Sequence, residues 1–284
     1  MACGIPTSRS RRPGRGQRSG FTIVELTIVA GIVALLITIL APSLSIAREQ
    51  ARRTVCRANL RQIGQGWSYY LSDNDDKFYK GYGPAGLNAH IFYGGKVSRR
   101  YTSWEPVERP LNRYMQLEPI MTKGADVFAC PSDRSNAPWL VKKAERLFDD
   151  AGTSYYMNYW LIGQWVSDAM PAPLGPALLE KLPRLPGPSG QRDDRVLTIT
   201  LVDEAASHVV LGGDAGMHFA WNQCRRERQI NWHRKADHHM LLFLDGHAAF
   251  VPMKLGHTAT AAYTFMPFRK HQTLALENPM CRPN

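Results

Sequence analysis

The stretch that decides the fold is residues 21–47, which read FTIVELTIVAGIVALLITILAPSLSIA. Its only charged side chain is Glu25, and its 27 residues exceed the roughly 20 that a helix needs to cross the hydrocarbon core of a bilayer. The stretch therefore predicts one membrane-spanning helix. Across all 284 residues, 44% are hydrophobic and 21% charged, so the rest of the chain is long enough and apolar enough to form a globular domain.

Residues 1–20, immediately before this stretch, form a basic segment. They contain five arginines and no acidic side chain, and their removal lowers the formal charge of the chain from +11 to +6. Much of the basic character thus lies in a segment that a processed protein would lack. The high isoelectric point therefore does not by itself indicate nucleic-acid binding.

Three interpretations account for this N-terminus. A secretory signal peptide would be cut after Ala47, but the apolar stretch is longer than the usual signal core of about 7–15 residues. An uncleaved anchor would carry arginines on both sides, which gives no positive-inside orientation. A cleavable leader that ends at Gly20, followed by an assembly helix, fits the details best.

The residues at this last boundary resemble those of type IV pilins and type II secretion pseudopilins. Gly20 precedes Phe-Thr-Ile-Val-Glu-Leu and, counted from Phe21 as one, Glu25 is fifth and Pro42 is twenty-second. The resemblance implies cleavage after Gly20 and N-methylation of Phe21 by a prepilin peptidase. It also implies a structural subunit, not an enzyme, that assembles with itself and with other pilin-like subunits.

The glutamate has a physical role in such an assembly. A carboxylate within a membrane helix costs about 2.5–3.5 kcal/mol and so usually marks a function. Cleavage would create an α-amine on Phe21 with an ordinary pKa of about 8. Pairing of Glu25 in one subunit with the amine of another would neutralise both charges. The plainer alternatives are a glutamate tolerated near the interface and, at Pro42, a simple kink.

The helical pattern continues beyond the membrane segment. Apolar residues recur at helical spacing at Leu60, Ile63, Trp67 and Leu71. Arginines recur four apart on another face at Arg53, Arg57 and Arg61. We expect one helix over residues 21–72, ended by Asp73-Asn74-Asp75-Asp76, with the arginines facing solvent or lipid headgroups. No nucleic-acid-binding motif accompanies them, so no specific nucleic acid is predicted as a partner.

The predicted organisation is a basic leader (1–20), a transmembrane and assembly helix (21–72) and a globular head (73–284). This arrangement predicts a single-pass protein of the inner membrane with its head in the periplasm or at the cell surface. The resemblance implies a pilin-like α+β fold, in which the long helix packs on an antiparallel sheet with long loops.

The clearest strands lie late in the head. Residues 240–244 and 247–251 are apolar and flank Asp245-Gly246, which predicts a hairpin with a type I′ turn. Residues 195–202 and 207–211 predict a further pair of strands. A short helix is expected to begin near Pro138 and to end just before Gly152, with Leu140, Ala144, Leu147 and Phe148 on one face.

Head motifs also resemble a bacterial family of prepilin-like proteins that carries a C-terminal His-x9-Asp-Gly signature. They are Cys130-Pro-Ser-Asp133, Ser154-Tyr-Tyr-Met-Asn158 and Asp245-Gly246-His247. Eleven residues separate His233 from Asp245 and six separate His238 from it, so neither histidine reproduces the signature. No role is assigned to that histidine.

Two metal sites were weighed against plainer interpretations. Zinc ligands occur around the hairpin at His233, Asp237, His238, His239 and His247. Adjacent His238 and His239 would point to opposite faces of a strand, so ordinary surface or sheet histidines are preferred. Calcium is the second candidate, at Asp73, Asp75 and Asp76, but these residues lack the full calcium-loop pattern. A helix stop explains them better, and no cofactor is predicted.

Of the five cysteines, Cys3 lies in the leader. The other four are candidate disulfide cysteines in an oxidising compartment: Cys56, Cys130, Cys224 and Cys281. Four cysteines allow three pairings, and the sequence does not choose among them. Cys130 as a nucleophile lacks an identifiable base.

An alternative function is a membrane-anchored binding module whose head recognises a polysaccharide or DNA. Its support is the aromatic content of the head loops, which include Trp104, Trp139, Trp160 and Trp165.

Overall fold

The structure is a computed structural model of the chain. It describes residues 21–79, 91–97, 108–134, 146–158, 161, 199, 202–217, 232–254, 257 and 259–265. The chain forms two compact units, Met1–Ala47 and Arg48–Asn284. The expected leader (1–20) and the loop tryptophans lie outside the described residues.

One long helix, α1, runs over Ile23–Asp73. It confirms the predicted helix to within two residues at its start and one at its end. The end comes where expected: the N–H groups of Asn74 and Asp76 donate to the carbonyl of Leu71, and Asp75 and Asp76 have positive φ. Because a left-handed backbone cannot continue an α-helix, the polar cluster terminates α1.

The second half of α1 buries the predicted apolar stripe. Leu60 and Ile63 are fully buried, Trp67 is 1% exposed and Leu71 6%. Each such side chain contributes about 1.5–3 kcal/mol through burial. Arg57 and Arg61 are exposed, as expected of the other face. Arg53 is an exception, because its guanidinium lies 4.4 Å from the ring centroid of Phe250.

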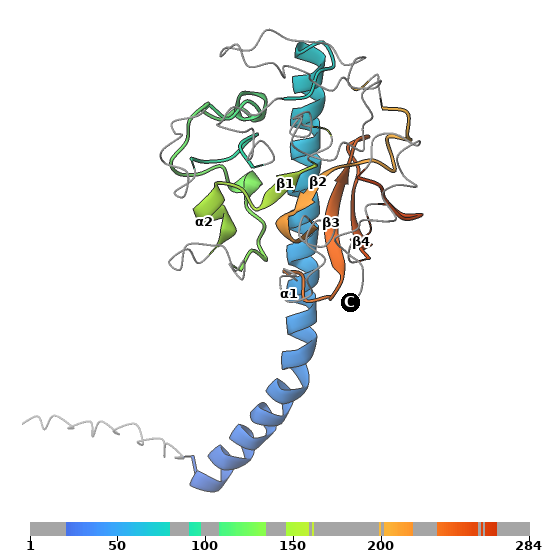
Figure 1. The fold of residues 1–284 in the computed structure, drawn as a ribbon. Coiled ribbons are helices and arrows are strands. Elements are labelled where there is room, and N and C mark those ends of the chain that lie inside the picture. The colour runs from blue at the N-terminus through green and yellow to red at the C-terminus, as the bar shows by residue number, and fades with distance from the viewer. Residues whose placement is uncertain are drawn as a thin grey trace, which may run out of the picture. The chain divides into compact units, whose positions relative to one another are not determined.

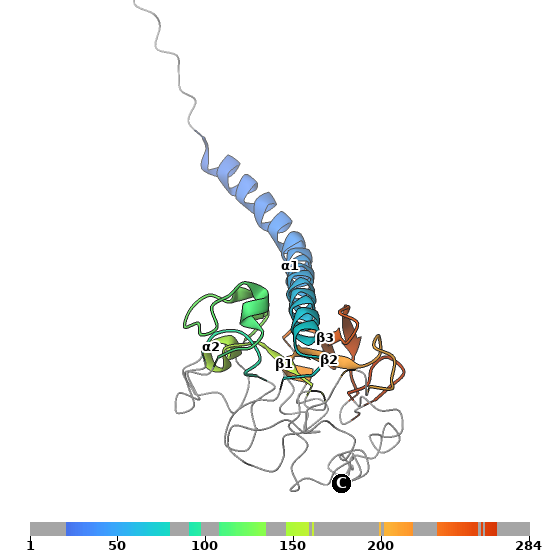
Figure 2. The ribbon, with the colours of Figure 1, turned by 90° about the horizontal axis from the view of Figure 1, so that it is seen from above.

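Four strands form one antiparallel sheet in the order β1-β2-β3-β4. Their bounds are β1 Tyr155–Met157, β2 Val210–Asp214, β3 His238–Phe243 and β4 Ala248–Pro252. In this unit the second half of α1 runs alongside the sheet, and the segment containing α2 lies on the opposite side of the helix from β3 and β4 (Figures 1 and 2). The expected α+β architecture, a long helix packed on an antiparallel sheet, is confirmed.

A glycine brings the helix and sheet together. A Cβ on Gly64 of α1 would lie 3.0 Å from Leu242 Cδ1 and 3.4 Å from Gly246 Cα. These distances leave little space for a side chain between α1 and the β3–β4 hairpin, so Gly64 sets how closely the two pack.

The β3–β4 hairpin is confirmed, but its predicted type I′ turn is wrong. Leu242 pairs with Ala248, and the Phe243 N–H donates to the His247 carbonyl at 2.9 Å. Three residues therefore connect the strands. Gly246 has φ of +85°, whereas Asp245 does not have the positive φ that a type I′ turn requires. The loop is thus a three-residue connection with glycine in the left-handed position.

The other predicted pair of strands, 195–202 with 207–211, is wrong in the bounds of its second strand and in that strand's partner. β2 begins at Val210, while Ser207 and His208 lie in a turn. Its neighbours are β1 and β3, and residues 195–198 lie outside the described part of the chain. Apolar β-branched residues predicted strands in this region, but local sequence does not determine which strands pair.

Short helices complete the described head: η2 Asn112–Met115, η3 Asp126–Phe128 and α2 Leu147–Ala151. Gly152 adopts φ of +83° directly after α2, as expected of a glycine that ends a helix. The core between these helices and α1 is aromatic. Trp67 stacks on Tyr93 with ring centroids 6.0 Å apart, and Tyr93 meets Phe128 edge-on at 5.8 Å.

Candidate functional sites

The start of α1 is organised by Thr22 and Glu25. Thr22 donates its N–H (2.9 Å) and its hydroxyl (2.8 Å) to Glu25 Oε2, and the Glu25 N–H donates back to Thr22 Oγ1 at 3.2 Å. This reciprocal arrangement is a capping box, which satisfies donors that a helix N-terminus otherwise leaves unpaired. The Thr-x-x-Glu spacing is the sequence signal for this cap, and it is separate from both roles considered for Glu25 above, the partner of an amine and a residue tolerated near the interface.

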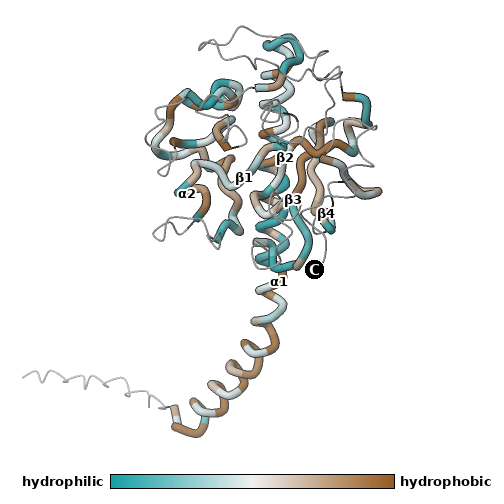
Figure 3. Tube along the Cα trace, viewed as in Figure 1, coloured by the Kyte–Doolittle hydropathy of each residue, from teal (hydrophilic) through white to brown (hydrophobic). Residues whose placement is uncertain are grey.

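The first half of α1 carries its apolar side chains uncovered by the described part of the chain. Ile23 is 82% exposed, Val24 65% and Leu35 63%, and this half of the helix is coloured mostly brown, with paler stretches between (Figure 3). By length and composition this helix can cross a membrane. Pro42 lies inside it and is also exposed. An apolar surface of this extent requires an apolar surrounding, either lipid or other helices.

The Cys130-Pro-Ser-Asp133 motif caps α2. Asp133 accepts hydrogen bonds from the N–H groups of Leu147 (2.9 Å) and Phe148 (2.8 Å). It also accepts one from the hydroxyl of Ser154, at 2.6 Å. Burial raises the pKa of Asp133, and these three donors work against that rise. The first two head motifs thus contact each other through Asp133 and Ser154.

The end of the second motif anchors the sheet edge. Asn158 donates its side-chain N–H groups to the carbonyls of Val210 (2.7 Å) and Phe265 (2.8 Å). In both motifs, therefore, polar residues make hydrogen bonds that stabilise the fold of the head.

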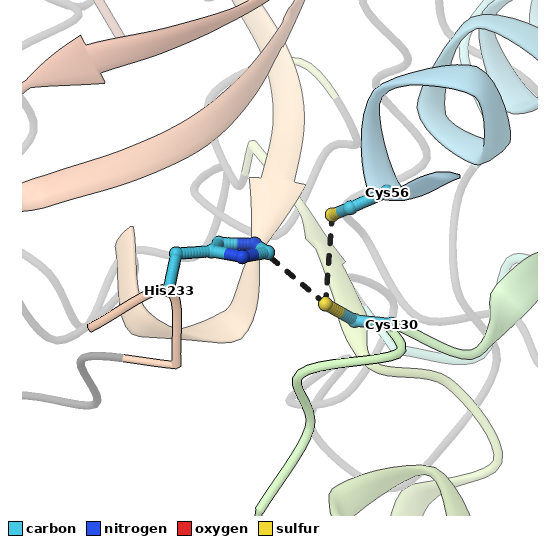
Figure 4. Close-up of side chains that lie close together, drawn as sticks. All are labelled: Cys56, Cys130 and His233. Atoms are coloured by element: carbon cyan, nitrogen blue, oxygen red, sulfur yellow. Dashed lines mark hydrogen bonds between the residues drawn. The ribbon is translucent and has the colours of Figure 1, made fainter. Parts of the chain in front are cut away.

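A buried cluster forms where α1 meets these motifs. Cys56 comes from α1, Cys130 from the segment after η3, and His233 from the turn before β3; the three side chains point toward one another (Figure 4). The two Sγ atoms are 3.5 Å apart, and Cys130 Sγ lies 3.7 Å from His233 Nε2. Both cysteines are fully buried, and His233 is 1% exposed.

Glu49 supports the histidine from one side. Its Oε1 lies 3.2 Å from His233 Nδ1 and accepts a hydrogen bond from Ser132 at 3.3 Å. Glu49 is 5% exposed. Burial lowers the pKa of His233, but its contacts with Cys130, Asp214 and Glu49 raise the pKa overall.

A second buried acid–histidine pair lies in the sheet. Asp214 Oδ1 is 2.9 Å from His239 Nδ1, and Asp214 Oδ2 accepts from the Met240 N–H at 2.7 Å. Burial opposes ionisation of Asp214, but the adjacent histidines and backbone donor lower its pKa overall. His239 is buried, whereas its neighbour His238 is half-buried and lies against the ring of Phe250, with centroids 5.4 Å apart.

The order Cys130–His233–Glu49 has the connectivity of a nucleophilic triad, but its environment is unsuited to that chemistry. Burial raises the pKa of the Cys130 thiol well above its ordinary value, and the neighbouring Cys56 raises it further. A nucleophilic cysteine needs its thiolate form and access to substrate; burial here opposes the first and prevents the second. The cluster is better suited to holding a metal ion or to a structural contact.

The remaining predicted site residues divide as follows. Phe21, Glu25 and Pro42 lie in the first unit, and Gly20 is outside the described residues, as are Cys224 and Cys281. Cys56 and Cys130 are adjacent but free, so the disulfide pairing stays a prediction.

Neither of the two metal alternatives weighed above groups His233 with the two cysteines. Asp75 makes a 2.9 Å ion pair with Lys77 in the turn after α1. His247 pairs with Asp245 at 2.6 Å. Within the described residues, the one place where three potential ligands converge is Cys56, Cys130 and His233. The sequence gives only a weak signal for this cluster. Glu49 and Cys56 lie seven residues apart on one face of α1, and Cys130 belongs to the Cys130-Pro-Ser-Asp133 motif.

Comparisons with known proteins find similarity in the N-terminal region. The chain is 30% identical over 60 residues to "Prepilin peptidase-dependent protein A" of Clostridium perfringens, covering 21% of this chain and 43% of that protein. It is 41% identical over 56 residues to "Type IV wide pilus major component PilA4" of Thermus thermophilus, covering 20% and 43% respectively. It is 32% identical over 60 residues to "Type II secretion system core protein G" of Pseudomonas aeruginosa, covering 21% and 42%.

The N-terminal region is therefore distantly homologous to type IV pilins and type II secretion pseudopilins. The chain spans less than half the length of these relatives. No family model matches the chain, and no solved structure matches it.

Proposed function

We propose that this chain is a structural subunit of a type IV pilus-like filament or a type II secretion pseudopilus. The observation that carries the proposal is a coincidence of two properties: the homology falls on the N-terminal region, and this region also holds an uncovered apolar helix. In a membrane the helix is surrounded by lipid, and in a filament by the equivalent helices of other subunits. No catalytic role is proposed.

Maturation belongs to the same proposal. A prepilin peptidase cleaves after Gly20 and methylates Phe21, which becomes the first residue of the mature chain. Support comes from the register of Phe21, Glu25 and Pro42 and from a relative whose name describes it as prepilin peptidase-dependent. The mature protein then crosses the inner membrane once, with its head in the periplasm or at the cell surface.

Glu25 is proposed to guide assembly by pairing with the N-terminal amine of a neighbouring subunit. In the single chain its carboxylate is occupied by Thr22, and those two hydrogen bonds are local and exposed. They hold the carboxylate near the helix start until an amine from another subunit replaces them. The exchange neutralises two charges that a membrane would otherwise disfavour.

Incorporation of tagged variants into cross-linked assemblies in the producing cell tests this role. Glu25→Ala is expected to reach the membrane in normal amount and to be lost from the assemblies by at least tenfold. Thr22→Ala is the matched control, because it removes the hydroxyl that donates to Glu25, leaves the backbone N–H donor and keeps the charge of the glutamate, so it should assemble. Normal incorporation of Glu25→Ala would overturn the role of the glutamate.

A further inference from the structure

We propose that Cys56, Cys130 and His233 form a Zn²⁺ site that ties the assembly helix to the head. The inference stands on the second unit alone and does not depend on processing or filament assembly. Its first support is convergence: all three ligand atoms lie within 4.8 Å of one another. They come from three segments separated by 74 and 103 residues along the chain.

The spacing fits tetrahedral zinc. With Zn–S bonds of about 2.3 Å and Zn–N bonds of about 2.0–2.1 Å, tetrahedral angles place two sulfurs about 3.8 Å apart and a sulfur and a nitrogen about 3.6 Å apart. The corresponding distances here are 3.5 Å between the sulfurs and 3.7 Å from Cys130 Sγ to His233 Nε2. The third pair, Cys56 Sγ and His233 Nε2, lies within 4.8 Å, so the ion is admitted once these two atoms move closer together, and a water molecule would complete the four ligands.

The surroundings of the histidine match those of a metal ligand. Glu49 Oε1 lies 3.2 Å from His233 Nδ1, so the Nδ1–H donates to the carboxylate and the Nε2 lone pair faces the sulfurs. Ser132 in turn donates to Glu49 and holds it in place. Carboxylate–histidine–metal arrangements of this kind fix the tautomer and strengthen the ligand.

A zinc ion satisfies this cluster more fully than a disulfide would. Both cysteines are free in the structure, with their sulfurs 3.5 Å apart. A Cys56–Cys130 disulfide would leave the buried Nε2 of His233 facing a sulfur with no hydrogen to donate. Leaving such an acceptor unpaired is costly. Zn²⁺ satisfies both thiolates and the imidazole together.

Burial gives the ion a structural role. All three ligands are at most 1% exposed, so the site excludes bulky substrates. Soft thiolate and imidazole ligands favour Zn²⁺ over Mg²⁺ or Ca²⁺, which prefer oxygen. The ion would bind the second half of α1 to the Cys130 motif and to the start of β3, and it would stabilise the folded head.

Metal titration of the full chain in detergent, reduced and then stripped of metal by chelator, tests the proposal. We expect one Zn²⁺ per chain, a melting temperature that rises with zinc concentration, and, with Co²⁺, the intense thiolate-to-metal charge-transfer band of tetrahedral coordination. Cys130→Ser and His233→Asn should lose stoichiometric binding. His238→Asn is the matched control, because His238 lies outside the cluster, and it should bind as the wild type does.

The supporting role of Glu49 has its own measurement. Glu49→Ala is expected to weaken zinc binding about 10- to 100-fold, and Glu49→Gln, which keeps an acceptor oxygen for His233, should recover much of that loss. Two results overturn the proposal. The first is that folded wild type binds Zn²⁺ no more tightly than Cys130→Ser does. If the variants do not fold, the equivalent result is that the wild type gives no charge-transfer band with Co²⁺. The other is a Cys56–Cys130 disulfide in protein isolated from cells without reductant.

Discussion

The two halves of α1 use their apolar residues in opposite ways. In the first half, side chains such as Leu36 are exposed (52%), and no described residue of the chain covers them. In the second half, Trp67 and its neighbours in the stripe are enclosed by the head. One continuous helix thus stabilises its own domain with one half and offers the other to lipid or to other helices. The apolar content of a helix therefore does not reveal whether its partner lies within the chain.

Truncating the stripe should give the largest difference between the halves. Trp67→Ala removes a side chain packed against Tyr93 and Phe78, and we expect it to lower the free energy of unfolding of the head by about 3–5 kcal/mol. The matched change Leu36→Ala should alter it by less than about 0.5 kcal/mol. Urea unfolding of the full chain in detergent, followed by near-ultraviolet circular dichroism, measures both. Equal losses would contradict the division of α1.

The motif contact around Asp133 gives the next largest effect. Asp133→Ala leaves two buried backbone N–H groups and the Ser154 hydroxyl without their acceptor, so unfolding should become easier by about 2–3 kcal/mol. Asp75→Asn, at an 86% exposed side chain, serves as the control and should change stability by under about 0.5 kcal/mol, because asparagine tolerates the left-handed backbone there. The same unfolding assay applies, and an unchanged midpoint for Asp133→Ala would refute the capping role.

Two glycines on α1 sharpen the comparison further. Gly64→Val places a branched side chain where even a Cβ lies 3.0 Å from Leu242, and it should cost the head about 1–3 kcal/mol. A Cβ at Gly31 meets nothing within 4 Å in the chain, so Gly31→Val should leave head unfolding unaltered. Gly31 lies in the first half of α1, which we propose to mediate assembly, so its substitution is expected to lower incorporation into filaments instead. Head destabilisation by Gly31→Val would argue against this separation.

The smallest expected effect concerns pH. Because the pKa of Asp214 is lowered in the folded head, its contribution to stability is present above the ordinary value of 3.8 and is lost as pH falls through the folded value. Stability of the wild type should therefore decline more steeply below about pH 4 than that of Asp214→Asn. Glu25→Gln changes a carboxylate of the other unit and should leave the pH profile of head unfolding as it is. Parallel profiles for wild type and Asp214→Asn would remove the role assigned to the Asp214–His239 pair.

Much of the fold was predictable because it rests on local patterns. The apolar run of residues 21–47 predicts the first half of α1, periodic apolar residues predict the second half, and the polar cluster at 73–76 predicts its end. The β3–β4 hairpin follows from two apolar runs around Asp245-Gly246. The turn type was missed because Asp-Gly suits both a two-residue turn and a three-residue loop with glycine in the left-handed position. The pairing of β2 was missed because its partners, β1 and β3, are set by long-range packing.

The buried cluster was less accessible to sequence reasoning. Cys56, Cys130 and His233 are far apart along the chain, and nothing local indicates that they meet. In the sequence His233 belongs to a group of histidines near the hairpin, and Cys56 and Cys130 are candidate disulfide partners. Neither pattern predicts that the histidine meets the two cysteines. Nothing in the sequence marks Glu49, because a glutamate among arginines on a helix is typical of a solvent-exposed surface.

The central claim is that the first half of α1 is an assembly segment exposed by processing. The most direct test is the N-terminal mass of the protein recovered from the membranes of its own cells. The account predicts a chain that begins at N-methylated Phe21. A chain that begins at Arg48, or one that retains residues 1–20, would contradict it.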